Sequence, residues 1–407
     1  MRPFRLLVLL PLFAALTWTA DLRAQRAQPP RPTVTVAFLG LGDDPRWQRW
    51  ETYANLELRE AMDPADGARV AMRDARIVGR VLGVDFDLEV RRAKDLEALR
   101  GAFEELAASG VRYFLVDLDG PDLAAFVAPY RDREVLFFNV SAYDDELRGE
   151  KCQANLLHTI PSLRMLADGL SQYLAHQGWH RILVLQGPDP EDAEIAQVFA
   201  VSARRFGNRV VEVRQFLPTH DPRSREQNNV RLLTTGVDYD VVFVADHRGE
   251  FGRRVPYATV LARPVISMTE HGPTIGLQPS AWHWASERFG SPQLNQRFER
   301  QVDHRRRMRD ADFAAWAAVR QLLEAMMKAK SADFAAVRDA LLAPDARLDV
   351  YKGVPASFRP WDRQMRQPIV LHTHNAVIDY APLPQFLHQF NVLDTLGVDE
   401  PDTACRL

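Results

Sequence analysis

Residues 85–120, "DFDLEVRRAKDLEALRGAFEELAASGVRYFLVDLDG", decide the predicted fold. The stretch begins with a β-rich run at 85–93, continues with a run of helical period at 95–110 and ends in a second β-rich run at 113–120. A strand, a helix and a strand in this order are typical of a βαβ unit, in which the two strands are parallel and the helix covers one face of the sheet.

Further units of this kind lie on both sides and predict two lobes. The first set runs from a β-rich run at 34–40 to one at 135–140, and the second set runs from about residue 152 to a β-rich run at 239–247. A chain of 407 residues is also typical of about two domains. We therefore predict an α/β fold with two doubly wound parallel-sheet lobes. Beyond them we expect a strand at 264–268, helices within 291–328 and 332–343, and a β-hairpin across 357–382 that turns around 362–365.

The N-terminus has the layout of a secretory signal peptide. Arg2 and Arg5 precede the apolar run "LLVLLPLFAALTWTA", which is followed by the polar, proline-rich "DLRAQRAQPPRP". The apolar run is too short for a membrane-spanning helix. We expect removal of residues 1–25 and a freely soluble, periplasmic protein that is not embedded in a membrane.

Composition and motifs argue against several function classes. The formal net charge of −3 gives no general attraction to nucleic acid or to an anionic membrane. The nucleophile elbow G-x-S-x-G, the zinc helix H-E-x-x-H and the phosphate loop G-x-x-x-x-G-K-[ST] are absent from the sequence. We therefore expect a binding protein without catalysis; the motifs identify no cofactor.

The sequence has two cysteines, Cys152 and Cys405. In an oxidising compartment they are most simply one disulfide that ties the C-terminal tail to the middle of the chain. The alternative is two unrelated buried thiols.

Several predicted strands end in carboxylates. In an open parallel sheet the ligand crevice lies outside the carboxyl ends of the strands, so acidic loops at these ends favour a cationic or amine-bearing ligand. The alternative is helix capping, because aspartate is a preferred N-cap and turn residue. The acidic residues in these loops are Asp43, Asp44, Asp117, Asp119, Asp144, Asp145, Asp189, Glu191, Asp192, Asp246 and Glu270.

Five stretches of the chain resemble a known family. They are "ANLLHTIPS" (154–162), "DYDVVFVADHRGEFGRRVPY" (238–257), "SAWHWASERFGSPQLNQRFER" (280–300), "SFRPWDRQMRQPI" (357–369) and "FLHQFNVLDTLGVDEPDTAC" (386–405). With the two lobes and the export signal, the chain resembles a type I periplasmic solute-binding protein of the branched-chain amino-acid class, which serves an ABC transporter. More specifically, it is similar to the subfamily encoded beside PQQ-dependent alcohol dehydrogenase systems, in which both cysteines have matching positions.

The resemblance implies a monomer whose two lobes are joined by crossover strands and close around a solute by a hinge motion. The implied partner is the permease of an ABC transporter; a receptor, in a sensing role, is the alternative. The expected boundaries are 1–25 for the signal peptide, 32–148 plus 264–330 for lobe 1, and 152–262 plus 332–407 for lobe 2 with the C-terminal hairpin and tail.

The resemblance also implies roles for single residues. Ser141 and Ala142 occupy the place where relatives hold the ligand carboxylate, and Glu270 lies near the acidic residue that takes the ligand amine. Asp246 and His247 lie in a loop that closes on the ligand. The full set of expected ligand-binding residues is Asp43, Asp44, Trp47, Asp117, Asp119, Ser141, Ala142, Asp144, Asp145, Asp246, His247 and Glu270.

One loop departs from the pattern of the relatives. Asp117 and Asp119 stand where relatives have small residues, and they would repel the carboxylate of an amino acid. PQQ-dependent alcohol dehydrogenases use Ca²⁺ or a lanthanide, which prefer carboxylate oxygens. We therefore expect a cationic or metal-bearing solute, rank PQQ itself lower because it is a polycarboxylate, and take as candidate metal ligands Asp117, Asp119, Asp144 and Asp145.

Overall fold

The computed structural model describes residues 31–47, 50–52, 56–59, 62–218, 221–224, 226–268, 275–302 and 305–407. The expected signal peptide and Glu270 lie outside these residues. None of the described helices is long and apolar enough to cross a membrane.

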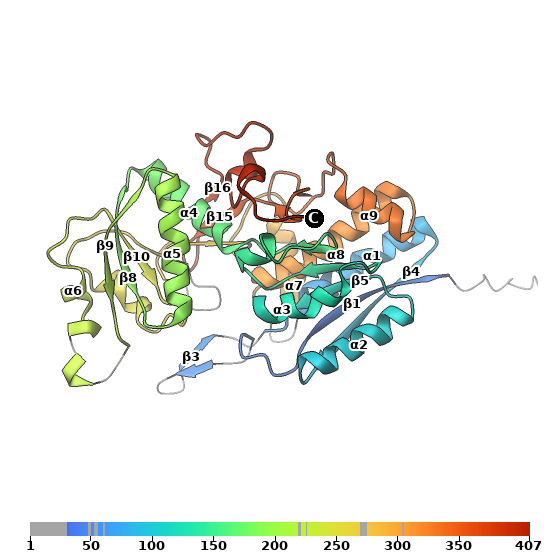
Figure 1. The fold of residues 1–407 in the computed structure, drawn as a ribbon, viewed down its shortest axis with the longest axis horizontal. Helices are drawn as coiled ribbons and strands as arrows, with labels where there is room; N and C mark the ends of the chain where they lie inside the picture. The colour runs from blue at the N-terminus through green and yellow to red at the C-terminus, as the bar shows by residue number, and fades with distance from the viewer. Residues whose placement is uncertain are drawn as a thin grey trace, which may run out of the picture. The chain divides into compact units, whose positions relative to one another are not determined.

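The first sheet has five parallel strands in the order β4-β1-β5-β6-β7. Its helices lie on both faces, and Figure 1 shows α1 and α2 on opposite sides of β1. The strands are β1 (Thr33–Leu41), β4 (Asp85–Ala93), β5 (Tyr113–Asp117), β6 (Leu136–Asn139) and β7 (Leu156–His158). The helices are α1 (Ala65–Leu82), α2 (Leu96–Ala108), α3 (Gly120–Val127), α8 (Asp310–Ala329) and α9 (Phe334–Leu342).

Buried side chains of these strands point to both faces of the sheet, which explains why helices pack against both faces. Val36 and Phe38 belong to a core that includes residues of α1 and α8. Ala37 and Leu39 point to the opposite face and pack in a separate core with residues of α2 and α3. Successive residues of a strand point to opposite faces, so a strand that is apolar at every position must be buried on both sides.

The second sheet has four parallel strands in the order β11-β10-β8-β9. Phe199 of the helix that follows β8 stacks on Phe243 of β10 at 3.7 Å between ring centroids. The strands are β8 (Arg181–Gln186), β9 (Arg209–Gln215), β10 (Val241–Ala245) and β11 (Val265–Ser267). The helices are α4 (Leu163–Gln177), α5 (Pro190–Arg205) and α6 (Val230–Leu233). The predicted α/β class with two parallel sheets is confirmed.

The remaining elements form smaller sheets. Strands β12 (Gln278–Ser280), β15 (Ile369–His372) and β16 (Val377–Ala381) make an antiparallel sheet in the order β12-β15-β16. Two antiparallel pairs are β2 (Trp50–Thr52) with β3 (Leu56–Arg59) and β13 (Ser357–Phe358) with β14 (Met365–Arg366). The expected single hairpin at 357–382 is therefore two short ones. The helices expected within 291–328 are α7 (Ser291–Gln301) and α8.

The expected lobe boundaries differ from the structure at three elements. Strand β7 pairs with β6 in the first sheet although its residues were expected in lobe 2. Strand β11 pairs with β10 in the second sheet although its residues were expected in lobe 1. Helix α9, expected in lobe 2, packs against α8. The hydrogen-bonding partner of a short strand depends on the order of strands in space, which sequence periodicity does not report.

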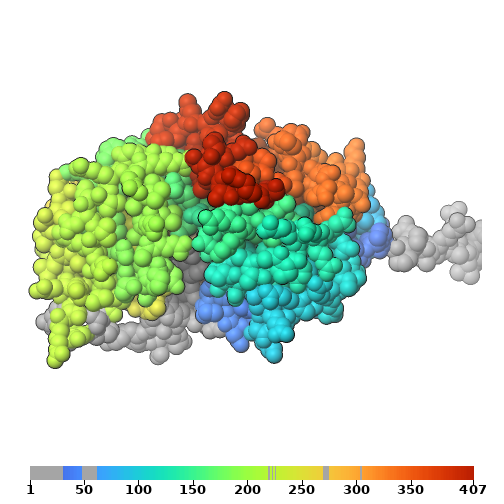
Figure 2. All heavy atoms as spheres, viewed as in Figure 1, coloured from blue at the N-terminus to red at the C-terminus, as the bar shows by residue number. Residues whose placement is uncertain are grey.

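The expected disulfide between Cys152 and Cys405 is present and closes a separation of 253 residues. It fixes the C-terminal tail, drawn in red in Figure 2, to the segment that follows β6.

Candidate solute-binding site

A charged cluster lies at the carboxyl ends of the first sheet, centred on Asp117. This residue ends β5, and its side chain is 0% exposed. Its carboxylate accepts hydrogen bonds from Trp47 Nε1 at 3.0 and 3.1 Å, from Arg46 Nη2 at 3.2 Å and from Arg92 Nη1 at 3.0 Å. Both of its oxygens are therefore engaged with donors from β4 and the loop after β1.

Arg46 joins Asp117 to two other expected site residues. Its guanidinium donates to both carboxylate oxygens of Asp44, with Nη2–Oδ2 at 2.5 Å, and its Nη1 donates to Ser141 Oγ at 3.2 Å. Burial disfavours its charge, but Asp44 and Asp117 outweigh this cost and raise the pKa of Arg46. Asp43, one residue earlier in the turn, is exposed.

The amides expected to hold a ligand carboxylate already have an acceptor. Asn139, buried at the end of β6, receives hydrogen bonds on its Oδ1 from the backbone N–H groups of Ser141 at 3.2 Å and Ala142 at 2.9 Å. Its Nδ2 donates to the Ala142 carbonyl at 2.8 Å. The side chain of Asn139 thus shapes this loop, a role that the sequence analysis missed.

Two of the expected acidic ligands lie at helix N-termini. Asp119 is the N-cap of α3 and accepts a hydrogen bond from the Asp122 N–H at 2.9 Å. The Asp145 carboxylate accepts from the Arg164 N–H in the first turn of α4 at 3.2 Å, and desolvation raises its pKa. The capping alternative therefore accounts for these two carboxylates.

Asp144 packs against the start of α3. A Cβ atom added to Gly120 would lie 2.0 Å from Asp144 Cγ, so this approach requires glycine. Of the expected metal candidates, Asp117 is bound by cationic side chains, whereas Asp144 faces a helix N-terminus, where a negative charge is favourable.

In the second sheet, Asp192 organises the loop between β8 and α5. Asp189 and Asp192 form the capping box of α5, with the Asp189 N–H donating to Asp192 Oδ2 at 3.2 Å. Asp192 Oδ1 accepts the His247 N–H at 2.7 Å and lies 2.9 Å from His247 Nδ1. The hydrogen bond to Asp192 raises the pKa of His247, against partial desolvation. The sequence analysis placed His247 in the site but left out Asp192 as its partner.

Asp246 closes the loop that follows β10. Its carboxylate accepts the backbone N–H groups of Gly249 at 3.0 Å, Phe251 at 3.0 Å and Gly252 at 2.7 Å. Burial raises the pKa of Asp246, in opposition to these hydrogen bonds. The charge of Asp246 is thus held by backbone amides and not by a cationic side chain.

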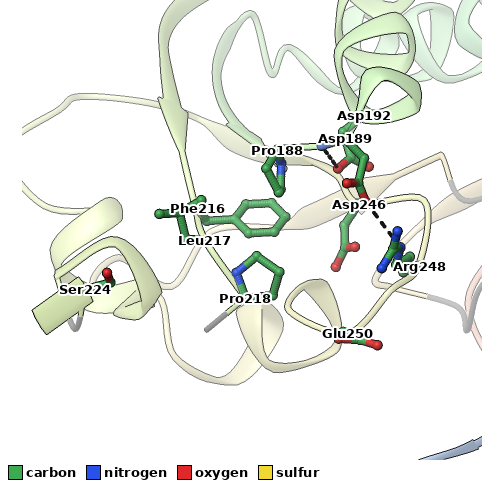
Figure 3. A pocket seen from close by; sticks show the side chains of 10 residues that line it. All are labelled: Pro188, Asp189, Asp192, Phe216, Leu217, Pro218, Ser224, Asp246, Arg248 and Glu250. Atoms are coloured by element: carbon green, nitrogen blue, oxygen red, sulfur yellow. Dashed lines mark hydrogen bonds and ion pairs between the residues drawn. The ribbon is translucent and has the colours of Figure 1, made fainter. Parts of the chain in front are cut away.

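These loops line a cavity of about 330 Å³ that is open to solvent, at the carboxyl ends of the strands of the second sheet. Figure 3 shows the Phe216 ring between Pro188 and Pro218, with Asp189, Asp246 and Arg248 beside these three residues. Arg248 Nε lies 3.2 Å from Asp189 Oδ2. The lining residues are Pro188, Asp189, Asp192, Phe216, Leu217, Pro218, Ser224, Asp246, Arg248 and Glu250.

Carboxylates outside the cavity also act on one another. Partial desolvation and then the negative charges of Asp144, Asp145 and Glu146 raise the pKa of Glu194 on α5. Sequence analysis missed Glu194 because a glutamate on an exposed helical position is common. Negative charge therefore extends from the loop after β6 to the N-terminal half of α5.

Among the described residues, the acidic and histidine side chains close enough to share one ion are not the expected set. They are Asp189, Asp192 and His247, whose ligand atoms lie within 4.8 Å of one another. Both oxygens of Asp192 already accept hydrogen bonds from the protein.

Comparison with known proteins identifies the family of this fold. Residues 61–375 match the family model described as "Periplasmic binding protein". No curated protein matches significantly. A periplasmic binding protein from Burkholderia mallei is 13% identical, with a TM-score of 0.61 over 92% of this chain and 98% of that one. A branched-chain amino-acid ABC transporter ligand-binding protein from Burkholderia xenovorans is 12% identical, with a TM-score of 0.66 over 85% and 95%.

A third solved structure is the solute-binding protein of an ABC transporter from Rhodopseudomonas palustris in complex with 3,4-dihydroxybenzoic acid. It is 12% identical, with a TM-score of 0.58 over 84% of this chain and 93% of that one. At such identities the three likenesses concern the fold alone. Because the family model covers most of the described chain, this protein belongs to the periplasmic binding protein family.

Proposed function

We propose that this protein is the periplasmic solute-binding subunit of an ABC transporter, that it performs no catalysis, and that its solute is positively charged. The observation that carries the proposal is the cavity at the second sheet, which is lined by four carboxylates and one guanidinium, with the His247 imidazole beside Asp192. The four are Asp189, Asp192, Asp246 and Glu250.

The cavity suits a small organic cation better than an anion. Its volume of about 330 Å³ is in the range of small-ligand pockets. Arg248 compensates only part of the negative charge, since it is paired with Asp189. The Phe216 ring, which stacks on Phe251, and the two prolines offer an apolar wall.

The first sheet argues against an amino acid held in the manner of the relatives. The amides of Ser141 and Ala142, where the resemblance places the ligand carboxylate, donate to Asn139. Arg46, the nearest cationic group, is engaged by Asp44 and Asp117. A ligand carboxylate would have to break these internal bonds before it gained its own.

A finer proposal concerns the identity of the solute. The resemblance to the subfamily encoded beside PQQ-dependent alcohol dehydrogenases makes Ca²⁺, a lanthanide or a metal-bearing chelate candidates for the solute. Asp189, Asp192 and His247 are close enough to share an ion if the Asp192 hydrogen bonds rearrange. PQQ ranks lower because its carboxylates would meet those of the cavity.

Isothermal titration of the purified protein tests the charge of the solute. The ligands are aliphatic and aromatic amines, Ca²⁺, La³⁺, PQQ and leucine. We expect heat from at least one cation and none from leucine. Tight binding of PQQ or leucine together with no response to any cation would contradict the proposal.

Two substitutions test the location. Glu250→Gln and Asp189→Asn each remove one negative charge, and asparagine retains the N-cap of α5. Each should weaken binding of the cation about fivefold to tenfold, which corresponds to about 1 kcal/mol. Asp339→Asn, at an exposed carboxylate on α9, is the matched control and should bind like the wild type.

Recovery of the partner separates transport from sensing. A pull-down from periplasm-facing membranes should recover the permease of an ABC transporter. Recovery of a histidine kinase in its place would favour the sensing alternative.

A further inference from the structure

Residues 383–392, here called the C-terminal loop, present large apolar side chains to solvent. Leu387 is 83% exposed and Phe390 is 82% exposed, and Val392 is also exposed. A single exposed leucine is ordinary, but two nearly fully exposed large side chains within four residues are typical of an interaction site. Figure 2 shows the red C-terminal part of the chain at the surface.

The loop is held firmly in spite of this exposure. Phe386 packs edge-on against Phe206 at 5.2 Å between ring centroids. His388, between the two exposed side chains, binds Asp399 Oδ2 through Nε2 at 2.9 Å and accepts the Phe390 N–H on Nδ1 at 3.2 Å. The fixed imidazole thus sets the direction of the backbone that follows it, through the N–H groups of Phe390 and Asn391.

The base of the loop is anchored by a buried ion pair. Arg359 is almost fully buried, and its Nε donates to Asp394 Oδ1 at 3.0 Å. Arg366 Nε also donates to Asp394 Oδ1, at 2.7 Å. The disulfide of Cys405 secures the segment that follows. A rigid loop pays little conformational entropy when it binds, which favours docking over a loosely held end.

The surroundings of the loop are acidic. Asp399, the partner of His388, is followed by Glu400 and Asp402, whose side chains are exposed, and Arg406 is the one exposed cationic side chain among residues 399–407. The tail then approaches the segment after β6, where Ala404 Cβ would contact a side chain at Gly149, where Glu150 is exposed, and where the exposed Lys151 is paired with Glu146. An apolar centre with an acidic border is complementary to an apolar pocket with a basic border.

We propose that the C-terminal loop is the docking element for a protein partner that has an apolar pocket bordered by lysine or arginine. The acidic border disfavours two other occupants. An anionic membrane would repel these carboxylates, and a second copy in a two-fold arrangement would bring the same carboxylates face to face. The surface lies apart from the residues that line the cavity, so this proposal does not depend on the solute.

Photo-cross-linking in the native host identifies the partner. A photoreactive phenylalanine analogue replaces Phe390 in the full chain, and a control chain has it at Tyr257, which is exposed elsewhere. We expect a protein adduct from position 390 that is absent from position 257. Adducts only with lipid or with a second copy of this chain, or no adduct, would overturn the proposal.

Binding of the purified partner then tests the chemistry. Leu387→Ser combined with Phe390→Ser should weaken binding about tenfold or more, because exposed anchors carry most of the affinity of such interfaces. Glu400→Lys combined with Asp402→Lys should also weaken it, and added salt should weaken binding of the wild type. An affinity unchanged by either pair would refute the proposal.

The same variants separate this proposal from the proposed function. All of them should keep the wild-type unfolding midpoint, since the altered side chains are exposed, and should bind the cation as the wild type does. Loss of cation binding in Glu250→Gln with normal partner binding would show that the two sites are independent.

Discussion

The carboxylates of the two sheets are held in different ways. At the first sheet, Asp117 and Asp44 are bound by the guanidinium groups of Arg46 and Arg92, so negative and positive charges compensate each other. At the second sheet, Asp246 is bound by backbone N–H groups, which supply hydrogen bonds without a full positive charge. The same residue type after a strand can therefore be a closed ion pair in one lobe and a remaining negative charge in the other.

The comparison has a consequence for ligand binding. A carboxylate that is paired with arginine offers little to an incoming cation, because the pair must first be broken. A carboxylate that is held by amides keeps its net charge and can attract a cation to the space beside it. The second sheet is thus where the solute should make its charged contact.

The largest expected loss of stability comes from removing Asp117, the centre of the charged cluster at the first sheet. Asp117→Ala removes the buried acceptor that Arg46, Arg92 and Trp47 share, and loss of the acceptor of buried charged donors is costly although Arg46 keeps Asp44 and Arg92 keeps Asp63. We expect a loss of about 3 kcal/mol in the free energy of unfolding, measured by urea denaturation. Asp119→Asn, which retains the exposed N-cap of α3, is the control and should change stability by less than about 0.5 kcal/mol. A loss below about 1 kcal/mol for Asp117→Ala would show that the contacts of Asp117 with Arg46 and Arg92 contribute little to stability.

Much of the fold could be predicted from the sequence, because strand and helix periods are local properties. The run at 85–120 forms β4, α2 and β5 as expected. The boundaries of the lobes could not be predicted, since β7 and β11 are three residues long and their sheet depends on which neighbour lies beside them in space. The local hydrophobic period predicts whether a segment is a helix or a strand, but it does not predict which strand lies beside it.

The positions of the acidic loop residues were predictable in outline, and their contacts were not. The acidic loop residues were expected, and many do lie at the carboxyl ends of strands. Arg92 was not expected, because it lies within β4 and reaches Asp117 only through the strand order β4-β1-β5. Asn139 was missed because it reads as the last residue of an apolar strand, although its amide fills the place expected for a ligand carboxylate.

An intermediate loss of stability is expected when Asp246, whose carboxylate is bound by backbone N–H groups, is replaced. Asp246→Ala removes the acceptor of three backbone N–H groups and should cost about 2 kcal/mol, since water can replace part of what is lost. Asp246→Asn keeps one oxygen acceptor and should recover part of this loss. Hydrogen exchange of the Gly249, Phe251 and Gly252 amides measures the effect directly. Unchanged exchange in Asp246→Ala would mean that the carboxylate does not hold this loop.

The smallest expected effect is a pH dependence of the free energy of unfolding that arises from His247. Its hydrogen bond to Asp192 raises the pKa of the imidazole above the unfolded value of about 6.5. The protonated ring therefore contributes stability that is fully present below the unfolded pKa and is lost as the pH rises through the folded pKa. His247→Gln should remove this dependence, which is measured by urea unfolding in buffers of equal ionic strength from about pH 5.5 to about pH 8.5. If the wild type and the variant have parallel pH profiles, Asp192 binds the neutral and the protonated ring equally well. The electrostatic potential at His247 would then be less negative than the neighbouring carboxylates suggest.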